Sequence, residues 1–383
     1  MPKLKIAHII TQLELGGAQE NTLYTVTHLD IRAYDCYLLT GKNGQLDNVA
    51  VNALGAKAIF IPSLVRSIRP WKDLLALIAL CRVCRQEKFD LVHTHSSKAG
   101  ILGRWAAKIA GVKKIIHTYH GFGFNEFQKP WTRFVFTWIE RLTAYITDTL
   151  IVVSAENTKK ALAAKIGKPG QYVVIHSGIK VKEYENVSID KAMEKKKIGL
   201  PPGAPVIGMI ACFKPQKAPL DFVRIAQLVI AKMPRAEFIM IGDGELRPEI
   251  EGLIRKLSLS DNVKLLGWRS DIPAMLKIMD VCVLTSLWEG LPRVILEAFV
   301  SRVPVVATPA DGIKEVVEDG VTGFLAGFHN LPEFAAKIIT CLEDPEKNRT
   351  IIENAGKKVS GSFNIDIMVQ DIAQLYDQAR GNE

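Results

Sequence analysis

Short apolar runs alternate with helix-length amphipathic stretches along both halves of the chain. In the first half these runs predict strands at residues 6–10, 36–39, 58–61, 91–95, 114–118 and 149–153. A second series predicts strands at residues 206–211, 237–241, 263–266, 281–284 and 303–307. Strands that are apolar on both faces and separated by helices are typical of parallel sheets covered on both sides. The pattern therefore predicts an α/β fold with two doubly wound sheets.

The length and the boundary signals favour two domains. A chain of 383 residues is too long for one ordinary α/β core. We expect Rossmann-like domains over residues 1–180 and 181–363, joined through a charged, proline-containing stretch, with residues 364–383 forming a final helix that packs back on the first domain. Because parallel sheets bind ligands at the carboxyl ends of their strands, a shared ligand would lie in a cleft between the domains.

Composition and charge limit the class of protein. Apolar residues make up 48% of the chain and charged residues 23%, which is typical of a globular protein. No apolar run approaches the roughly 18–20 residues of a membrane span, and no cleavable signal is visible. The net charge of +9 is uneven, since residues 1–175 carry 23 Lys and Arg against 12 Asp and Glu. We expect the first half to face an anionic membrane surface or a phosphate-bearing lipid rather than nucleic acid, for which no motif is visible.

The cysteines and histidines do not indicate a metal site. Cys81 and Cys84 form a C-x-x-C within a predicted helix and have no partner pair, so we interpret the thiols as those of a cytoplasmic protein. Four histidines lie at two predicted strand ends: His93, His95, His117 and His120. No carboxylate or thiol accompanies them at a metal-binding spacing. His120, which precedes a glycine at a strand exit, is the best placed of the four to hydrogen-bond a ligand.

The segment Trp288–Phe299 is the most informative part of the chain. Glu289 lies in a turn after an apolar strand, and Glu297 follows eight residues later in a predicted helix. Pro292 fits the first turn of that helix, so the amides around it form an anion site. Carboxylates that accept hydrogen bonds from hydroxyls, next to a helix end that accepts a diphosphate, suit a sugar nucleotide. The alternative for Glu297 is a surface ion pair with Arg293.

Glycine and lysine residues follow several other predicted strands. The glycine turns are Gly16-Gly17 in the first half and Gly242-x-Gly244 in the second. Neither has the G-x-G-x-x-G pattern of NAD-binding proteins, and a tight turn without a ligand is an equal alternative for each. Lys214 and Lys217 follow the first strand of the second half, where they could neutralise a diphosphate. A basic solvated loop is the alternative, which the nearby Glu289 loop outweighs.

These features, in this order, resemble the retaining, nucleotide-sugar-dependent glycosyltransferases of family 4, which have the GT-B fold. The resemblance extends almost from end to end and includes residues 308–323, which look like the last sheet loops of that family. It implies a glycosyltransferase of the bacterial surface-polysaccharide type that needs no metal and no cofactor. By family habit the donor is a UDP-sugar and the acceptor a lipid-linked saccharide.

The resemblance also implies roles for individual residues. Glu289, His120 and Lys217 would be catalytic: Glu289 and His120 would contact the donor sugar, and Lys217 would hold the diphosphate. Glu297 would accept hydrogen bonds from the ribose. The other donor-binding candidates are Gly16, Gly17, Lys214, Gly242, Trp268, Arg269, Gly290 and Leu291. The family usually has an arginine five residues before the phosphate lysine; Cys212 stands there, so Lys214 is the candidate replacement.

The acceptor side is predicted from residues 124–141, which combine aromatic and basic residues at helical spacing. Such a pattern is typical of an interfacial membrane helix, and a helix packed by its aromatic face on the sheet is the alternative. We expect a peripheral enzyme at the inner face of the cell membrane that acts on a polyprenyl-diphosphate sugar. Two other functions are considered: a UDP-sugar epimerase or hydrolase of GT-B-like fold, and a non-catalytic sugar-nucleotide-binding protein.

Overall fold

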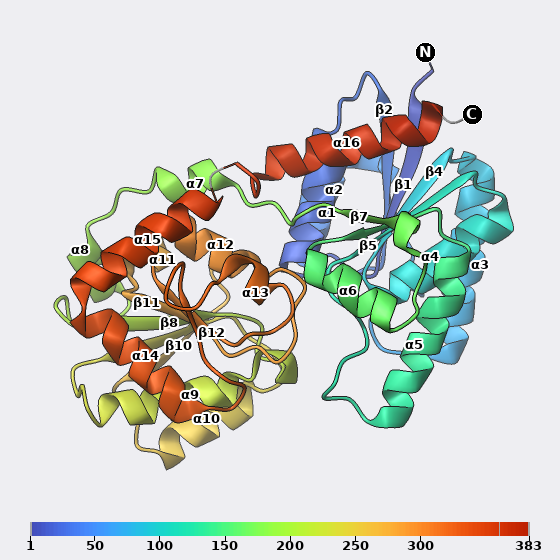
Figure 1. Ribbon diagram of the computed structural model, residues 1–383. Helices are drawn as coiled ribbons and strands as arrows, with labels where there is room; N and C mark the ends of the chain where they lie inside the picture. The colour runs from blue at the N-terminus through green and yellow to red at the C-terminus, as the bar shows by residue number, and fades with distance from the viewer. Residues whose placement is uncertain (1, 360, 382–383) are drawn as a thin grey trace. The chain divides into compact units, whose positions relative to one another are not determined.

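The computed structural model describes residues 2–359 and 361–381. The chain forms two compact units, the first made of Met1–Gly178 and Ile365–Glu383, the second of Ile179–Asn364. Each unit is an open sheet of parallel strands with helices on both faces (Figure 1). The predicted α/β class with two Rossmann-like parallel sheets is confirmed.

The first unit contains a seven-stranded sheet in the order β3-β2-β1-β4-β5-β6-β7. Its strands are β1 Leu4–Ile10, β2 Tyr34–Thr40, β3 Ala58–Phe60, β4 Leu91–His95, β5 Lys114–Tyr119, β6 Thr149–Val152 and β7 Tyr172–Val174. The strand order reverses between β1 and β4, and loops at such a reversal are the usual ligand sites of this fold. The unit's helices of five or more residues are α1 Gly17–His28, α2 Asp47–Leu54, α3 Pro70–Glu87, α4 Ser97–Ala110, α5 Pro130–Tyr145, α6 Ala155–Ala163 and α16 Ile365–Gly381.

Alternation along β1 explains how these helices cover the sheet. Ile6 and Ile10 lie on one face and pack in a core with residues of α1 and α16. Ala7 and Ile9 lie on the other face and pack with α3 and α4. Because successive side chains of a strand point to opposite faces, an apolar strand of this kind requires a helical layer on each side.

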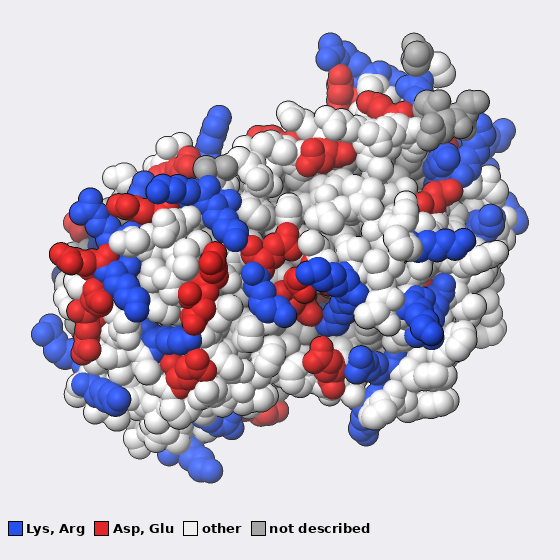
Figure 2. All heavy atoms as spheres, viewed as in Figure 1, with Lys and Arg blue, Asp and Glu red and all other residues white. Residues whose placement is uncertain are grey.

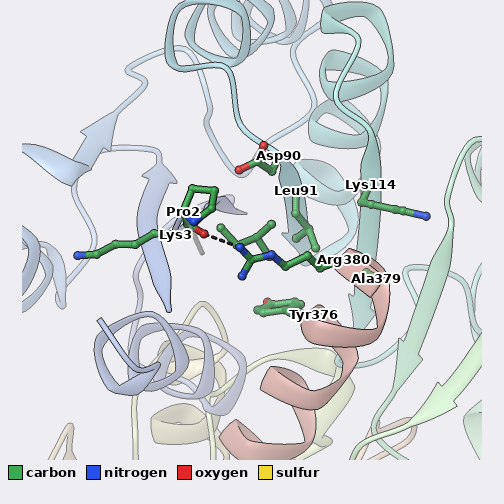
Figure 3. A pocket seen from close by; sticks show the side chains of 9 residues that line it. Pro2, Lys3, Asp90, Leu91, Lys114, Tyr376, Ala379 and Arg380 are labelled. Atoms are coloured by element: carbon green, nitrogen blue, oxygen red, sulfur yellow. Dashed lines mark hydrogen bonds between the residues drawn. The ribbon is translucent and has the colours of Figure 1, made fainter. Parts of the chain in front are cut away.

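The last helix, α16, completes the first unit. Tyr34 donates a hydrogen bond to Asp377 at 2.7 Å, and Tyr24 donates one to Asp366 at 2.6 Å. A Cβ at Gly178 would lie 2.3 Å from the Cα of Ile365, so glycine is required at this close approach. Toward its end α16 borders a cavity of about 140 Å³ at the amino ends of β1, β4 and β5 (Figure 3). Ligands of parallel sheets bind at the opposite, carboxyl ends.

The second unit contains a six-stranded sheet in the order β10-β9-β8-β11-β12-β13. Its strands are β8 Val206–Ile210, β9 Glu237–Ile241, β10 Val263–Gly267, β11 Val281–Leu284, β12 Val305–Ala307 and β13 Phe324–Leu325. Its α-helices are α7 Val181–Glu185, α8 Lys191–Lys197, α9 Pro219–Ile230, α10 Arg247–Lys256, α11 Ile272–Ile278, α12 Arg293–Val300, α13 Ile313–Val316, α14 Leu331–Glu343 and α15 Pro345–Val359. The strand order reverses between β8 and β11.

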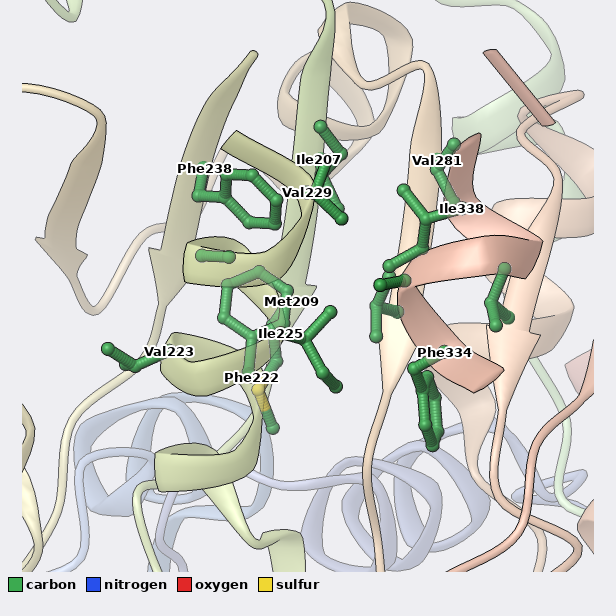
Figure 4. Close-up of a cluster of buried hydrophobic side chains, with 14 of the residues drawn as sticks. Ile207, Met209, Phe222, Val223, Ile225, Val229, Phe238, Val281, Phe334 and Ile338 are labelled. Atoms are coloured by element: carbon green, nitrogen blue, oxygen red, sulfur yellow. The ribbon is translucent and has the colours of Figure 1, made fainter. Parts of the chain in front are cut away.

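The core of the second unit packs α9 and α14 onto the sheet (Figure 4). Phe222 of α9 and Phe238 of β9 meet edge to face, with ring centroids 5.5 Å apart. Met209 and Phe334 are also fully buried, so strand and helix residues fill one continuous apolar layer. This layer fixes the strand ends from which the loops described below emerge.

Two details of the fold differ from the predictions. β7 and β13 were not predicted, because both are short edge strands of two or three residues and lack a long apolar run. α12 begins at Arg293 with Pro292 as its N-cap, one residue later than the predicted first turn. None of the helices formed by the described residues combines the length and the apolar character that a membrane crossing requires.

Candidate functional site

Two loops of the second unit meet where its strand order reverses. The loop after β8 contains Lys214 and Lys217, and the loop after β11 contains Glu289. Hydrogen bonds join the two loops: the amide of Leu287 donates to the carbonyl of Gln216 at 2.8 Å. The Gln216 side chain in turn donates to the carbonyl of Trp288 at 2.8 Å. The predicted lysine and glutamate loops are therefore held side by side.

Lys217 and Glu289 form a direct ion pair, with Lys217 Nζ in contact with Glu289 Oε1. The side chains are 19% and 7% exposed, so both charges are mostly withdrawn from water. The Thr285 hydroxyl holds the backbone of the lysine in place by donating a hydrogen bond to the Lys217 carbonyl at 2.8 Å. A cation and a carboxylate in contact can bind the phosphate and the hydroxyl groups of one ligand, because the first attracts anions and the second accepts hydrogen bonds.

The loop after β12 supports the Glu289 turn, which the sequence did not reveal. Asp311 accepts a hydrogen bond from the Glu289 amide at 3.1 Å, and its φ of +35° is unusual for a residue other than glycine. Thr308 donates a hydrogen bond to the carbonyl of Ser286. The Ser286 hydroxyl is buried and has no hydrogen-bond partner within the described part of the structure. Only its position directly after β11 could have indicated it as a candidate ligand contact.

Glu297 lies on α12, buried to 7% exposure. The ion pair with Arg293 that was considered as an alternative does form, at 3.4 Å, but the two side chains are only 11% and 10% exposed. It is therefore a buried pair at the start of α12 and not a surface contact. Pro292 is the N-cap of α12, and the first amides that follow a helix N-cap have no partner within the preceding turn, as at every helix start.

The other candidates of the second unit have different surroundings. Gly242, with φ of +129°, lies where a Cβ would be 2.0 Å from the carbonyl oxygen of Ala211, so packing alone requires glycine there. Arg269 pairs with Asp271 at 2.8 Å, and Trp268 is 43% exposed. Both follow β10, which is an edge strand separated from β8 by β9. The structure therefore places them in the same unit as Lys217 but not beside it.

The position of the missing arginine, Cys212, lies next to the Gly242 turn. The amide of Phe213 donates to the carbonyl of Asp243 at 2.9 Å. Arg247, which follows this turn, binds Asp243 at 2.9 Å and Glu251 at 2.8 Å, so nearby carboxylates already balance its charge. Lys214 therefore stays the candidate for the second cation of the diphosphate site.

The corresponding strand ends of the first unit carry Gly16, Gly17 and His120. Gly17 begins α1, and Gly16 is its extended N-cap. The Thr11 hydroxyl lies 2.8 Å from that of Ser96, which joins the loops after β1 and β4. Ser96 has φ +61° and ψ 156°, a conformation that is costly for residues other than glycine and is frequent at functional sites. These two hydroxyl residues were not predicted.

His120 follows β5 and is partly buried. Burial lowers its pKa to about 4, so the ring is neutral at pH 7. Its Nε2 lies 3.3 Å from Nδ1 of His95. A neutral imidazole offers one hydrogen-bond donor and one acceptor, which suits contact with a hydroxyl group rather than neutralisation of a phosphate.

Among the described residues, His8, His93 and His95 form a group that could hold a metal ion. One nitrogen of each ring lies within 4.8 Å of the others. These nitrogens are engaged in hydrogen bonds, including one of 3.1 Å between His8 Nδ1 and His95 Nε2. We therefore interpret the cluster as a hydrogen-bonded network.

Comparisons with known proteins agree with this arrangement. A family model described as Glycosyltransferase Family 4 matches residues 15–183, and one described as Glycosyl transferases group 1 matches residues 190–358. The UDP-Gal:alpha-D-GlcNAc-diphosphoundecaprenol alpha-1,3-galactosyltransferase of Escherichia coli is 33% identical over 377 residues, which cover 98% of this chain and 97% of that protein. The putative glycosyltransferase EpsD of Bacillus subtilis is 28% identical over 78% of each chain.

Solved structures show the same fold. HepE of Anabaena, solved in complex with UDP and glucose, has a TM-score of 0.84 at 24% identity and covers 98% of this chain and 100% of its own. The sucrose-phosphate synthase of Thermosynechococcus elongatus has a TM-score of 0.83 at 21% identity, with full coverage of both chains. The fold is thus GT-B. On the strength of the relative that is 33% identical along nearly its whole length, the chain belongs to the family 4 glycosyltransferases and is a glycosyltransferase.

Proposed function

We propose that this glycosyltransferase moves a sugar from a UDP-sugar to a lipid-linked saccharide in polysaccharide biosynthesis. The observation that carries the proposal is the buried Lys217–Glu289 pair at the strand reversal of the second unit. Similarity to the Escherichia coli galactosyltransferase supports the choice of substrates, since the name of that enzyme includes a UDP-sugar donor and a diphosphoundecaprenol-linked acceptor.

The donor-binding roles follow from the chemistry of each group. Glu289 would accept hydrogen bonds from the sugar hydroxyls, and Glu297 would accept them from the ribose. Lys217, Lys214 and the amides at Gly290 and Leu291 would hold the diphosphate between them, because cations and helix starts both attract anions. The contact between Lys217 and Glu289 supports this order, since the sugar and its phosphate are adjacent in the donor.

The reaction would depend on charge stabilisation. Cleavage of the sugar–phosphate bond builds positive character on the sugar and negative charge on the leaving diphosphate. Lys217 and the start of α12 would stabilise that negative charge. In a retaining, same-face reaction the leaving phosphate oxygen would take the proton of the acceptor hydroxyl. We therefore expect neither a dedicated general base nor a metal ion to be required.

Residues of the first unit would complete the donor contacts. We propose that the amides at Gly16 and Gly17, at the start of α1, bind the diphosphate. We propose that His120 contacts the donor sugar near the reacting carbon. The first amides of α1, whose N-cap Gly16 makes no side-chain cap hydrogen bond, and the neutral state of His120 support these roles.

UDP release tests the reaction. Purified enzyme should release UDP from one UDP-sugar of a panel only when lipid-linked acceptor is added. Glu297→Ala should lower the affinity for UDP about tenfold, because a hydrogen bond to a charged group contributes on the order of 1.5 kcal/mol. A thermal-shift titration with UDP measures this loss of affinity. Release without acceptor would indicate hydrolysis or epimerisation instead. A UDP-induced shift as large in Glu297→Ala as in wild type would contradict the ribose role.

The acceptor side of the proposal rests on α5. Its aromatic and aliphatic side chains at i, i+3, i+7, i+11 and i+14 form one stripe, called here the α5 stripe: Trp131, Phe134, Trp138, Leu142 and Tyr145. These side chains are 45–83% exposed, so the aromatic face does not pack on the sheet. Arg133 and Lys129 accompany the stripe, and Figure 2 shows Lys and Arg side chains among uncharged ones over the region of α5. Such a surface suits an anionic bilayer.

A groove beside α5 supports binding of the lipid carrier. It has a volume of about 470 Å³ and extends between α5 and the end of α6. Arg133, Arg141, Phe134 and Trp138 line it. A guanidinium group can donate two parallel hydrogen bonds to two oxygens of one phosphate, while aromatic rings pack against apolar chains. We propose that the groove receives the diphosphate and first isoprene units of the acceptor at the inner face of the membrane.

Vesicle sedimentation tests the membrane contact. At low salt the enzyme should sediment with vesicles that contain anionic phospholipid and stay in solution with purely zwitterionic ones. Combined replacement of Trp131, Phe134 and Trp138 by alanine should weaken binding at least roughly tenfold, because the lost apolar contact area no longer leaves water. Trp268→Ala, which removes a comparably exposed ring from the second unit, is the matched control. Wild-type protein that stays in the supernatant would contradict the proposal.

A further inference from the structure

A line of buried polar side chains crosses the apolar core of the first unit. His8 of β1 and His93 and His95 of β4 are at most 3% exposed. β1 and β4 pair in register with His8 opposite His93. Because side chains alternate along strands, these histidines share the sheet face of Ile6, which α1 and α16 cover.

Tyr376 of α16 begins the line. It is fully buried, and its ring projects from α16 toward the sheet (Figure 3). Its hydroxyl lies 2.5 Å from His93 Nδ1 and 3.3 Å from His8 Nε2. His8 Nδ1 then lies 3.1 Å from His95 Nε2, and His95 Nδ1 lies 3.3 Å from His120 Nε2. The line therefore connects the C-terminal helix with the candidate site residue His120.

All four imidazoles are neutral at pH 7. Burial lowers the pKa of His8 to about 3 and that of His120 to about 4. Burial and the neighbouring histidines lower the pKa values of His93 and His95 well below the ordinary value. A neutral imidazole carries one N–H and one lone pair. Each hydrogen bond in the line therefore fixes the direction of the next.

The distances indicate which atom donates in each hydrogen bond of the line. A hydroxyl donor makes shorter hydrogen bonds than an imidazole N–H, so the 2.5 Å contact is the one in which Tyr376 donates to His93. His93 then donates from Nε2 to the hydroxyl of Thr118, 2.7 Å away. Tyr376 accepts from Nε2–H of His8, whose Nδ1 must accept from His95. His95 Nδ1 must in turn accept from His120.

We propose that Tyr376 is a positioning residue that acts through His8 and His95 to hold His120 in its Nε2–H tautomer. His120 Nδ1 is then left as a hydrogen-bond acceptor for a hydroxyl of the donor sugar. The effect on sugar transfer rests on the proposed contact between His120 and the donor. The tautomer itself does not depend on that contact and can be measured without substrate.

Nitrogen-15 NMR of protein labelled at histidine tests the proposal. Wild-type His120, assigned by the signal that His120→Gln removes, should show a protonated Nε2 and a bare Nδ1. Tyr376→Phe leaves the Nε2–H of His8 without an acceptor. This unpaired donor disappears if His8, His95 and His120 each carry the proton on Nδ1 instead of Nε2, so that every hydrogen bond between them reverses its direction. A population of the Nδ1–H tautomer should therefore appear at His120. We expect kcat/KM to fall about tenfold, the effect of one mispaired buried group.

Two further variants separate this effect from loss of structure. Tyr34→Phe is the matched control, because Tyr34 lies beside Tyr376, with ring centroids 6.1 Å apart, and donates a hydrogen bond to Asp377 of α16. Within the described part of the chain, its hydroxyl makes no hydrogen bond to a histidine of the line. This variant should leave the His120 tautomer unchanged. His8→Leu interrupts the line at β1 and leaves Tyr376 of α16 in place, and it should shift the tautomer as Tyr376→Phe does.

The His120 tautomer in these variants either supports or overturns the proposal. A tautomer shift in Tyr376→Phe and His8→Leu, with none in Tyr34→Phe, supports the proposal even if sugar transfer is unchanged; in that case the donor contact of His120 is wrong. A bare Nε2 in the wild type overturns the proposal, as does a His120 tautomer that neither variant changes. One equivalent of zinc bound to the wild-type protein would also overturn it and assign the cluster to a metal.

Discussion

Replacement of Lys217 by alanine should reduce kcat for sugar transfer by roughly 10²- to 10³-fold, the usual effect of removing one group that stabilises developing negative charge. Lys217 is 19% exposed and contacts the buried Glu289. Because little water reaches this position, water that filled the space of the lost side chain would stabilise the leaving diphosphate much less than the lysine does. Since the charge develops on the leaving diphosphate, we expect the loss mainly in kcat and less in KM. Steady-state kinetics with saturating acceptor measure both values.

Lys337→Ala is the matched control for this prediction. Lys337 belongs to the same unit, is 21% exposed and also pairs with carboxylates, those of Asp319 and Glu333. Its replacement should leave kcat within about twofold of wild type, because Lys337 is not among the donor-binding candidates and its partner carboxylates are 53% and 35% exposed, so that its loss would affect stability by about 1 kcal/mol at most. Lys217→Arg, which keeps the charge, should retain part of the activity. Lys217→Ala enzyme with wild-type kcat would contradict the diphosphate role.

Replacement of Glu140 by alanine should destabilise the first unit by about 3–5 kcal/mol, the cost of leaving a buried charge without its partner. Glu140 of α5 accepts hydrogen bonds from Arg104 of α4 and from Tyr119 of β5, each at 2.8 Å. The Arg104 side chain is 0% exposed and that of Glu140 4%. Without the carboxylate, Arg104 would keep its positive charge inside the protein.

Thermal unfolding followed by tryptophan fluorescence measures this effect. Four of the six tryptophans, Trp71, Trp105, Trp131 and Trp138, lie in the first unit, so the signal reports mainly on its unfolding. A loss of this size should lower the transition temperature by roughly 10 °C for a unit of this length.

Two variants serve as controls for Glu140. Glu156→Ala removes a carboxylate of α6 whose partner Lys159 is 74% exposed, and it should change stability by less than about 0.5 kcal/mol. A double variant with Arg104→Met and Glu140→Leu should be more stable than Glu140→Ala, because it removes both charges together. Equal transition temperatures for wild type and Glu140→Ala would show that the buried pair does not support α5.

Much of the fold could be predicted because parallel sheets leave a strong local pattern. Central strands such as β1 and β8 are apolar on both faces and are separated by amphipathic helices, which few other folds produce. β7 and β13 are edge strands of two or three residues; the side chains of β7 are half-buried or exposed, and β13, with Phe324 buried and Leu325 partly exposed, is too short to show such a pattern. Length and exposure therefore decided which strands the sequence could reveal.

The candidate site could be predicted in part for a related reason. Lys217 and Glu289 each lie in the loop that follows a buried strand, so their place at a carboxyl strand end is a local property. Their contact depends on β8 and β11 being neighbours at the strand reversal, which is a property of topology. Asp311 was missed because its role arises from a hydrogen bond between loops that are distant in sequence, and Ser286 was missed because only the folded structure shows that its hydroxyl is buried without a partner among the described residues.

By itself, the sequence determined the fold class, the family resemblance and the two loops that carry the lysine and glutamate candidates. Only the tertiary structure decided which face of α5 is buried: Glu140 faces Arg104 in the interior, so the aromatic face on the opposite side of the helix is exposed to solvent. Only strand pairing placed His8 opposite His93, and only the return of α16 brought Tyr376 to both. Local patterns fix which elements form, whereas the burial of charge and the pairing of strands fix which side chains meet.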